Sequence, residues 1–201
     1  MDPLSPAVSD NDIRSLVAGV LAADARAIDG WYRCEHPEVH RLCFGFLADA
    51  AEAEDLTQDA MLHLHDRLGS WSPVRPYRSW RNTVVLNLCR DRLRRIEARA
   101  RAHERAAKNV LERGDPAPDP SSALERDEVQ ELLRETLEQL TPRERETFVL
   151  RELEGHSSEE TAEMLGVGVS SVRSLLSLAR RRLRGLLAHR MPELAGGGER
   201  G

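Results

Sequence analysis

The side chains best suited to chemistry in this chain lie near its C-terminal end, where arginine and serine recur among apolar residues. Residues 166–191 contain six arginines and no acidic residue. At about 100° per residue, a helix that buries Val172, Leu176 and Ala179 presents serine and arginine on its opposite face. Guanidinium and hydroxyl groups bind phosphates and base edges, so this face predicts contact with DNA. The candidate contact residues are Ser170, Ser171, Arg173, Ser174, Ser177, Leu178 and Arg181.

Two short capped helices precede this cationic helix. Thr141 and Glu144 form a capping box around a proline at the first helical position, and Ser157 and Glu160 repeat the box. Gly166 then supplies the left-handed residue of a tight turn. A short helix, a glycine turn and a long cationic helix are typical of a helix-turn-helix, whose second helix enters the major groove. An ordinary helical hairpin is the alternative, but it requires neither the charge asymmetry nor the serine-rich face.

Charge is segregated along the whole chain. Residues 78–108 contain ten basic and three acidic residues, although the net charge of the protein is −5. Residues 48–66 carry six acids and no Lys or Arg, and residues 112–146 carry eleven acids and five arginines. Because phosphate attraction depends on local charge, two basic blocks separated by acidic ones predict two nucleic-acid contacts. Solvated helix faces carry similar charge runs, and that interpretation of any one block stays open.

Apolar periodicity predicts helices almost throughout and no strand, which gives an all-α fold. Pro37 is expected in the first turn of a helix, and residues 69–79 in a loop, because two prolines and a glycine interrupt regular structure there. We expect two small helical domains, residues 10–108 and 124–190. The linker between them, residues 109–123, contains three prolines and is expected to be stiff.

Composition excludes several classes of protein. The chain has no apolar run of about 18 residues, so no membrane span is expected, and its N-terminus lacks the order of a secretory signal. Three cysteines without a CxxC pair predict a reducing, cytoplasmic compartment. No nucleophile–base set, phosphate loop or carboxylate pair stands out, which predicts a protein that is not an enzyme and uses no cofactor.

One cluster of soft metal ligands occurs within ten residues, at Cys34, His36, His40 and Cys43. His40 and Cys43 would share a helix face, which makes zinc binding or a redox switch an alternative, with Cys89 as a lesser candidate for oxidation. Cys43, however, lies on the apolar stripe, where a cysteine behaves as a small hydrophobic residue. We therefore expect no metal.

Two separated parts of the chain resemble the extracytoplasmic-function (ECF) sigma factors, the promoter-recognition subunits of bacterial RNA polymerase. Similarity to sigma region 4 runs from LTPRERE through GHSSEETAEMLGVGVSSVRS to ARRRLRGLL, within residues 140–187. Similarity to sigma region 2 lies in AEAEDLTQDAMLHL, residues 51–64, and in SWRNTVVLNLCRDRLRR, residues 79–95. Both motifs in this order, without a third domain between them, are specific for the family.

The resemblance implies that separate parts of the chain bind polymerase, the −10 element and the −35 element. The acidic helix would dock on core RNA polymerase through Glu54, Asp55, Gln58 and Asp59. Acids that only favour a helix N-terminus are the alternative interpretation. The following loop and helix would bind the −10 element, because aromatic rings stack on unpaired bases and arginine contacts phosphate. The −10 candidates are Trp71, Arg75, Tyr77, Arg78, Asn82, Asn87, Arg90, Arg94 and Arg95, with the rings of Trp71 and Tyr77 exposed. The serine and arginine face would read the −35 element.

The chain departs from the family pattern on that face. Leu175 and Leu178 stand where many members carry arginine, which predicts a weak or unusual −35 preference. The leading hypothesis is a sigma factor that directs core polymerase to promoters and promotes −10 melting, with double- and single-stranded promoter DNA as its ligands. An anti-sigma factor is a further partner that the family allows. The alternative is a sigma-like regulatory protein, metal- or redox-responsive in one form, that binds polymerase or another partner without initiating.

Overall fold

The computed structural model describes residues 10–111 and 134–190, and every regular element within these ranges is a helix. The all-α prediction is therefore confirmed. Most of the predicted linker falls outside the described residues, but its first three residues, 109–111, continue a helix.

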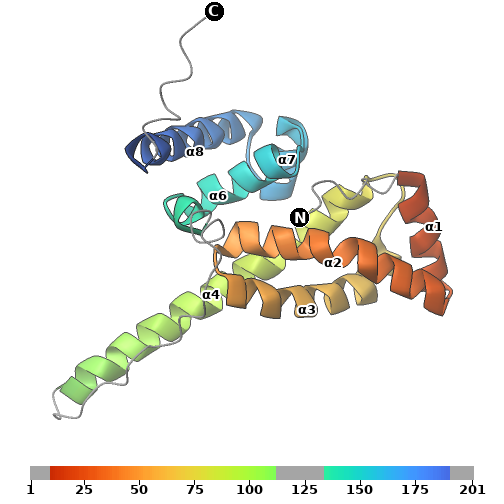
Figure 1. Cartoon of the computed structure of the whole chain (residues 1–201), viewed down its shortest axis with the longest axis horizontal. Coiled ribbons are helices and arrows are strands. Elements are labelled where there is room, and N and C mark those ends of the chain that lie inside the picture. Colours follow the sequence, from red (N-terminus) through yellow and green to blue (C-terminus); the bar gives the residue numbers. More distant parts are fainter. Residues whose placement is uncertain (1–9, 112–133, 191–201) are drawn as a thin grey trace, which may run out of the picture.

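The first module is a bundle around one long central helix. Its elements are α1 (Asp10–Leu21), α2 (Ala25–Leu47), α3 (Ala50–Arg67), the 3₁₀ turn η1 (Leu68–Ser70) and α4 (Tyr77–Leu111). α2 packs against α1, α3 and α4 (Figure 1). Its buried stripe includes Trp31, Val39 and Leu42, none more than 2% exposed. The second half of α4 leaves the bundle and projects away from it as a single helix (Figure 1).

α2 is one continuous helix, so the prediction that a helix begins at Pro37 is wrong. Asp24 caps α2, because its carboxylate accepts hydrogen bonds from two backbone N–H groups of the first turn. Pro37 sits on the exposed side of the helix and lacks the N–H that would bond to the preceding turn. Trp31 before it and Leu42 after it enter the same core, and this packing outweighs the missing hydrogen bond.

The second module contains the predicted helix-turn-helix. After a helical stretch at residues 134–138 come α6 (Pro142–Phe148), the π-helical turn η2 (Val149–Leu153), α7 (Ser158–Leu165) and α8 (Val169–Arg190). Both capping boxes are present, at Thr141 with Glu144 and at Ser157 with Glu160. Gly166 ends α7 at φ 66°, ψ 38°, the left-handed conformation that the turn requires.

The two modules share one hydrophobic core. Val149 of η2 and Met164 and Leu165 of α7 belong to the same buried cluster as residues of α2, α3 and α4. Gly45 of α2 permits the close approach, since a Cβ there would lie 3.1 Å from Val149 Cγ2. As a result α6 and α7 lie along the side of α2 opposite to α3, with α8 outermost (Figure 1).

Candidate nucleic-acid interface

The cationic face of α8 is open to solvent. The buried stripe consists of Val172, Leu176, Ala179 and Leu183, as the periodicity predicted. The seven candidate contact residues of this helix are all exposed: Ser170, Ser171, Arg173, Ser174, Ser177, Leu178 and Arg181. The structure therefore brings the predicted −35 residues together on one surface, adjacent to the glycine turn.

Ion pairs within the second module hold α8 in place. Arg180 Nη2 lies 2.8 Å from Glu152 Oε1, and Arg182 Nε lies 3.1 Å from Glu144 Oε2. Burial raises the pKa of Glu144, but its hydrogen bonds with Thr141 and the pairing with Arg182 outweigh this effect and leave the pKa lowered. These two arginines therefore position the helix in addition to adding positive charge near it.

Of the −10 candidates, five side chains are exposed and two are half-buried. The exposed ones are Arg75, Arg78, Asn87, Arg94 and Arg95, and the half-buried ones are Trp71 and Arg90. These residues lie on the turn before α4 and on the first half of α4. Arg94 pairs with Asp91 on the same helix, and the indole Nε1 of Trp71 donates to the carbonyl of Arg75 at 3.0 Å.

Tyr77 is buried, and the prediction that its ring is exposed is wrong. Tyr77 is the first residue of α4 and is 2% exposed. Its hydroxyl accepts a hydrogen bond from Trp31 Nε1 at 2.9 Å, which holds the ring in the core. Burial, together with the charge of Glu35, raises the pKa of Tyr77. The ring packs edge-on against Trp71 with centroids 5.4 Å apart, so Tyr77 supports the half-exposed indole and has no free face for a base.

Asn82 is also buried, at 0% exposure, and is not a surface contact. It lies where α4 meets the second module, beside Arg81 of the same helix. Asn82 Oδ1 accepts a hydrogen bond from Arg81 Nε at 2.9 Å, and its Nδ2 donates to Glu154 Oε2 at 3.2 Å. Periodicity alone could not have placed Asn82 inside, because its covering residues come from the other module.

Glu154 is the centre of this buried network. Its side chain is 1% exposed, and it pairs with three arginines: Arg41 at 2.9 Å, Arg78 at 3.2 Å and Arg81 at 3.4 Å. Burial alone raises the pKa of Glu154, but the hydrogen bond and charge of Arg41 and the charge of Arg81 lower it below its ordinary value. The second module therefore presents an ionised carboxylate to a cationic pocket of the first.

A second buried carboxylate, Glu35, faces the same pocket from α2. Arg81 Nη1 donates to Glu35 Oε2 at 3.2 Å, and Arg81 Nη2 lies 3.7 Å from Glu38 Oε2. Burial raises the pKa of Glu35 despite the opposing charge of Arg81. Arg81 is 2% exposed, and carboxylates from both modules pair with it: Glu35 from the first and Glu154 from the second.

His156 completes the network from the second module. Its Nε2 lies 2.7 Å from Asn82 Nδ2, and it is 6% exposed. Since Asn82 Oδ1 accepts from Arg81 and Nδ2 donates to Glu154, the amide orientation is fixed. His156 Nε2 must therefore accept a hydrogen bond, which requires the neutral ring. Burial lowers the pKa of His156, which favours this neutral form of the ring.

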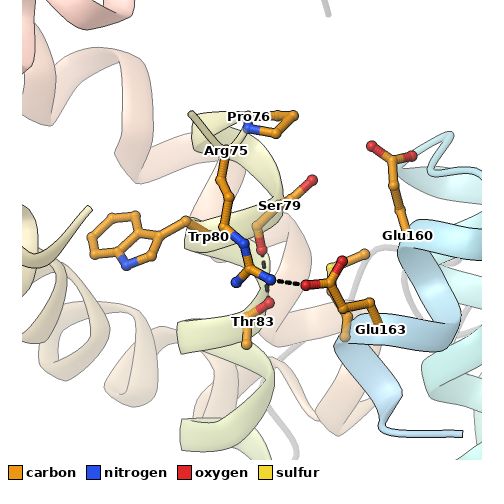
Figure 2. Close-up of a pocket in the computed structure, with 8 residues that line it drawn as sticks. Arg75, Pro76, Ser79, Trp80, Thr83, Glu160 and Glu163 are labelled. Atoms are coloured by element: carbon orange, nitrogen blue, oxygen red, sulfur yellow. Dashed lines mark hydrogen bonds and ion pairs between the residues drawn. The ribbon is translucent and has the colours of Figure 1, made fainter. Parts of the chain in front are cut away.

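Two further pairs close the edges of the interface between the modules. Arg90 makes a two-pronged contact with Glu146, at 2.7 and 2.8 Å. At the other edge Arg75 pairs with Glu163 of α7. The pair lies at a cavity of about 290 Å³ between α4 and α7. Figure 2 shows the two side chains pointing toward each other from the two sides of this cavity. The cavity is lined by Arg75, Pro76, Ser79, Trp80, Thr83, Glu160, Glu163 and Met164.

The predicted polymerase-binding residues lie on the outer face of α3. Glu54, Asp55, Gln58 and Asp59 are all exposed. Arg92 of α4 pairs with Glu52 and lies 3.5 Å from Asp55 Oδ2, so part of the acidic surface is balanced from within the module. The remaining acids form an exposed negative face, suited to a basic helical partner.

The Cys and His residues of α2 differ in burial and are not gathered into one group. Within residues 10–111 and 134–190, no group of three or more His, Cys, Asp or Glu side chains is arranged to hold a metal ion. Cys43 is 0% exposed in the core and lies beside Cys89, whereas Cys34, His36 and His40 are half-buried. Burial raises the pKa of both Cys34 and Cys89, which favours the unreactive thiol.

The sequence reasoning missed the acidic and imidazole groups that cover α4. These are Glu146, Glu154, His156 and Glu163. Of these four residues, only Glu146 lies within the acidic block at residues 112–146. Because the contacts join residues more than fifty positions apart, no local pattern could have identified them.

Comparisons with known proteins agree with this architecture. The family model for Sigma-70 region 2 matches residues 31–100, and that for Sigma-70, region 4 matches residues 130–183. The ECF RNA polymerase sigma factor SigM of Mycobacterium tuberculosis is 34% identical over 174 residues, covering 87% of this chain and 84% of SigM. RNA polymerase sigma-H factor of Pseudomonas aeruginosa is 28% identical over 172 residues, covering 83% of this chain and 89% of that protein.

Solved structures share the fold. CnrH in complex with the cytosolic domain of CnrY aligns with a TM-score of 0.60 at 23% identity, covering 88% of this chain and 97% of CnrH. The sigma factor RpoE in complex with the anti-sigma factor NepR, from Bartonella quintana, aligns with a TM-score of 0.55 at 21% identity, covering 79% and 95% of the two chains.

A bundle followed by a helix-turn-helix, matched by sigma region 2 and sigma region 4 in that order, defines a sigma-70-type transcription factor. This chain belongs to the ECF RNA polymerase sigma factors. Across the part of the chain that the structure describes, no helix is both long and apolar enough to cross a membrane.

Proposed function

We propose that this protein directs core RNA polymerase to promoters and promotes opening of the −10 element, by binding and without catalysis. The observation that carries the proposal is the face of α8. Arg173, Ser174 and Ser177 are exposed together on the second helix of a capped helix-turn-helix. An exposed cationic helix in that position enters the major groove, where its hydroxyl and guanidinium groups contact bases and phosphates. We assign α8 to the −35 element.

We assign the −10 element to the start of α4 and the turn before it. Trp71 offers a half-exposed indole for stacking, with Tyr77 buried behind it. Arg75, Arg78 and Arg90 supply positive charge for the phosphates of the strand. Arg94 and Arg95 add charge further along α4, and Asn87 adds a neutral polar side chain. Base–aromatic stacking contributes about 1–3 kcal/mol, enough for one indole to retain a transiently unpaired base.

Core polymerase is the partner proposed for α3. α3 lies on the side of the molecule away from α8 (Figure 1), and four of its exposed residues are mostly acidic: Glu54, Asp55, Gln58 and Asp59. Such a face gives electrostatic complementarity to a basic helical surface. Two of the aligned solved structures are described as complexes, one with CnrY and one with the anti-sigma factor NepR, and we propose an anti-sigma partner and a cytoplasmic location for this chain as well.

Run-off transcription with bacterial core polymerase tests the proposal, on promoters found by mapping transcription start sites after overexpression. The native chain should give promoter-specific transcripts. Arg173→Ala should weaken promoter binding by about tenfold, because a base-contacting arginine is worth about 1–3 kcal/mol. Arg33→Ala removes an equally positive, exposed side chain on α2 and should leave binding unchanged. Absence of a promoter-specific transcript from the native holoenzyme would contradict the proposal.

A sigma-like protein that binds polymerase without initiating is the second candidate. Leu178, 36% exposed on the DNA-facing side of α8, favours it, because an apolar side chain there suits a protein surface as well as a thymine methyl. This candidate predicts that the chain co-purifies with core polymerase yet yields no specific transcript.

A further inference from the structure

The second half of α4 lies outside both hydrophobic clusters of the described residues. Leu93 is the last residue of this helix that packs against a core, yet α4 continues to Leu111. Figure 1 shows this half leaving the bundle alone, and residues 97–103 are all exposed. Burial therefore does not explain why the chain forms a helix here, and the composition of the segment must indicate what it contacts.

Alanine and arginine make this segment a stiff arm. Residues 98–102 alternate alanine with arginine, and both residue types have a high helix propensity. The segment also extends a helix that is already formed in the bundle, so it needs no new nucleation. At 1.5 Å per residue, the distance along the helix axis from Arg90 to Arg105 is about 22 Å.

One side of the arm continues the register of the −10 candidates. At about 100° per residue, four arginines of α4 fall within about 60° of one another around the helix: Arg90, Arg94, Arg101 and Arg105. We call these four residues the arginine stripe. Arg99 lies about 160° around the helix from Arg101 and does not belong to the stripe. The arginine stripe therefore runs from the bundle out along the arm.

The outer half of the arginine stripe is free to bind an anion. Arg90 pairs with Glu146, and Arg94 pairs with Asp91. Arg101 and Arg105 are exposed and form no ion pair with another described residue. Residues 94–105 contain five arginines and two glutamates, so the arm is positively charged as a whole. Two guanidinium groups on one side of a stiff cationic helix suit phosphates, with which arginine forms short, charge-assisted hydrogen bonds.

We propose that the second half of α4 is a further DNA-binding arm, in which Arg101 and Arg105 contact phosphates of the double-stranded DNA between the −10 and −35 elements. This assignment rests on the proposed function, which gives the unpaired bases to Trp71, before α4 begins. The DNA that stays paired then lies farther along the helix, on the side of the −35 element. At 3.4 Å per base pair, an arm of about 22 Å covers roughly six base pairs beyond Arg90.

Contacts of this kind add affinity without reading sequence. Phosphate contacts fix the position of a protein on the duplex and carry no base preference. The arm therefore holds the paired DNA next to the −10 element whatever its sequence, and its contribution should appear on any duplex.

The test compares two single substitutions that are two residues apart. Arg101→Gln removes a charge from the arginine stripe, and Arg99→Gln removes the same charge from the other side of the same helix. Glutamine has a helix propensity close to that of arginine, so circular dichroism should show unchanged helicity in both. The double variant R101Q/R105Q removes both free groups of the stripe. The probe is a fluorescein-labelled 24-base-pair duplex of mixed sequence, and its binding to the full chain is followed by anisotropy over a range of salt concentrations.

Arg101→Gln should weaken binding by about fivefold at 0.1 M salt, and it should reduce the slope of log K against log salt by about one, because one phosphate contact is lost. The double variant should reduce this slope by about two. Arg99→Gln should keep the slope of the native chain. Equal slopes for Arg101→Gln and Arg99→Gln would overturn the proposal, since the arm would then contribute only general charge or bind an acidic protein surface instead.

A hydroxyl-radical footprint of the holoenzyme on a mapped promoter tests where the arm lies. The native protein should protect the backbone next to the −10 element on its −35 side, and R101Q/R105Q should lose this protection. Native holoenzyme that leaves this backbone unprotected would overturn the assignment. The proposed function fails differently, through the absence of a promoter-specific transcript in the run-off assay. Binding of a mixed-sequence duplex needs no promoter and no polymerase, so the two failures are distinguishable.

Discussion

Glu154 illustrates how much of this interface depends on single residues. A carboxylate with 1% exposure is stable in its charged form only if donors compensate for the lost water, and here they come from α2 and α4. Its lowered pKa means that its contribution to stability is present above the ordinary value of 4.5 and is lost as the pH falls through the lowered value. His156 responds at a higher pH.

His156 should make the packing of the two modules sensitive to mild acid. Its native pKa lies below the ordinary 6.5, so the opened or unfolded chain binds the extra proton more readily. The stabilisation is therefore complete above about pH 6.5 and declines as the pH falls from there towards the lowered pKa. The melting temperature of the native chain, followed by fluorimetry from pH 8 to pH 5.5, should fall across this window.

The variant His156→Gln isolates this effect from other histidines. A glutamine oxygen can accept the hydrogen bond from Asn82 but takes up no proton, so the decline between pH 6.5 and 5.5 should be smaller in the variant. The charges around the ring are Glu160, Arg78, Glu154 and Arg81, together with Arg151, whose guanidinium donates to the carbonyl of His156. Identical pH profiles for the two proteins would show that the ring does not have to be neutral.

At the scale of elements, local sequence was sufficient wherever the deciding interactions are local. The capping boxes at Thr141 and Ser157 and the left-handed Gly166 were predictable because each depends on neighbours three or four residues away. Pro37 and Tyr77 were placed wrongly for the opposite reason. Packing of α2 carries the helix through Pro37, and the hydroxyl partner of Trp31 draws Tyr77 into the core.

Arg145 joins two helix ends and should contribute to the docking of α6 on α2. Its guanidinium donates to the carbonyls of Phe46 and Leu47 at 3.2 and 3.3 Å, and to Leu137 at 2.9 Å. A lysine ammonium lacks the planar fork needed to reach these oxygens together. Arg145→Lys should therefore lower the free energy of unfolding by about 1–3 kcal/mol, measured by urea denaturation.

The matched control for Arg145→Lys is Arg33→Lys. Arg33 pairs with Asp29 at the surface of α2, with side-chain exposures of 77% and 63%, so its replacement should cost about 0–1 kcal/mol. If both variants unfold at the same urea concentration, Arg145 does not hold the modules together, and the apolar contacts of Val149 and Leu165 would have to do so.

At the scale of the molecule, the sequence indicated two DNA-facing modules but not that they pack together. The separate basic and acidic blocks were visible in the composition, but of the described residues in the acidic block 112–146 only Glu146 pairs across the interface, with Arg90, and Glu154 lies outside both acidic blocks. The pairing joins positions such as Arg78 and Glu154, 76 residues apart, and their partners come from different modules. One sequence does not specify which acid meets which base, because every surface carboxylate suits an arginine equally well.

Gly45 offers a way to open the molecule without removing a charge. A Cβ at this position would lie 3.1 Å from Val149 Cγ2 of the other module, and a leucine side chain needs more room than that contact allows. Leucine also favours a helix by about 1 kcal/mol over glycine, so α2 itself should persist in Gly45→Leu. We expect faster hydrogen exchange of the η2 amides. Gly185→Leu, where no atom lies within 4 Å, should leave this exchange unchanged. Unchanged exchange in Gly45→Leu would mean that Val149 simply moves aside, and the packing of the two modules would then have to depend on the ion pairs between them.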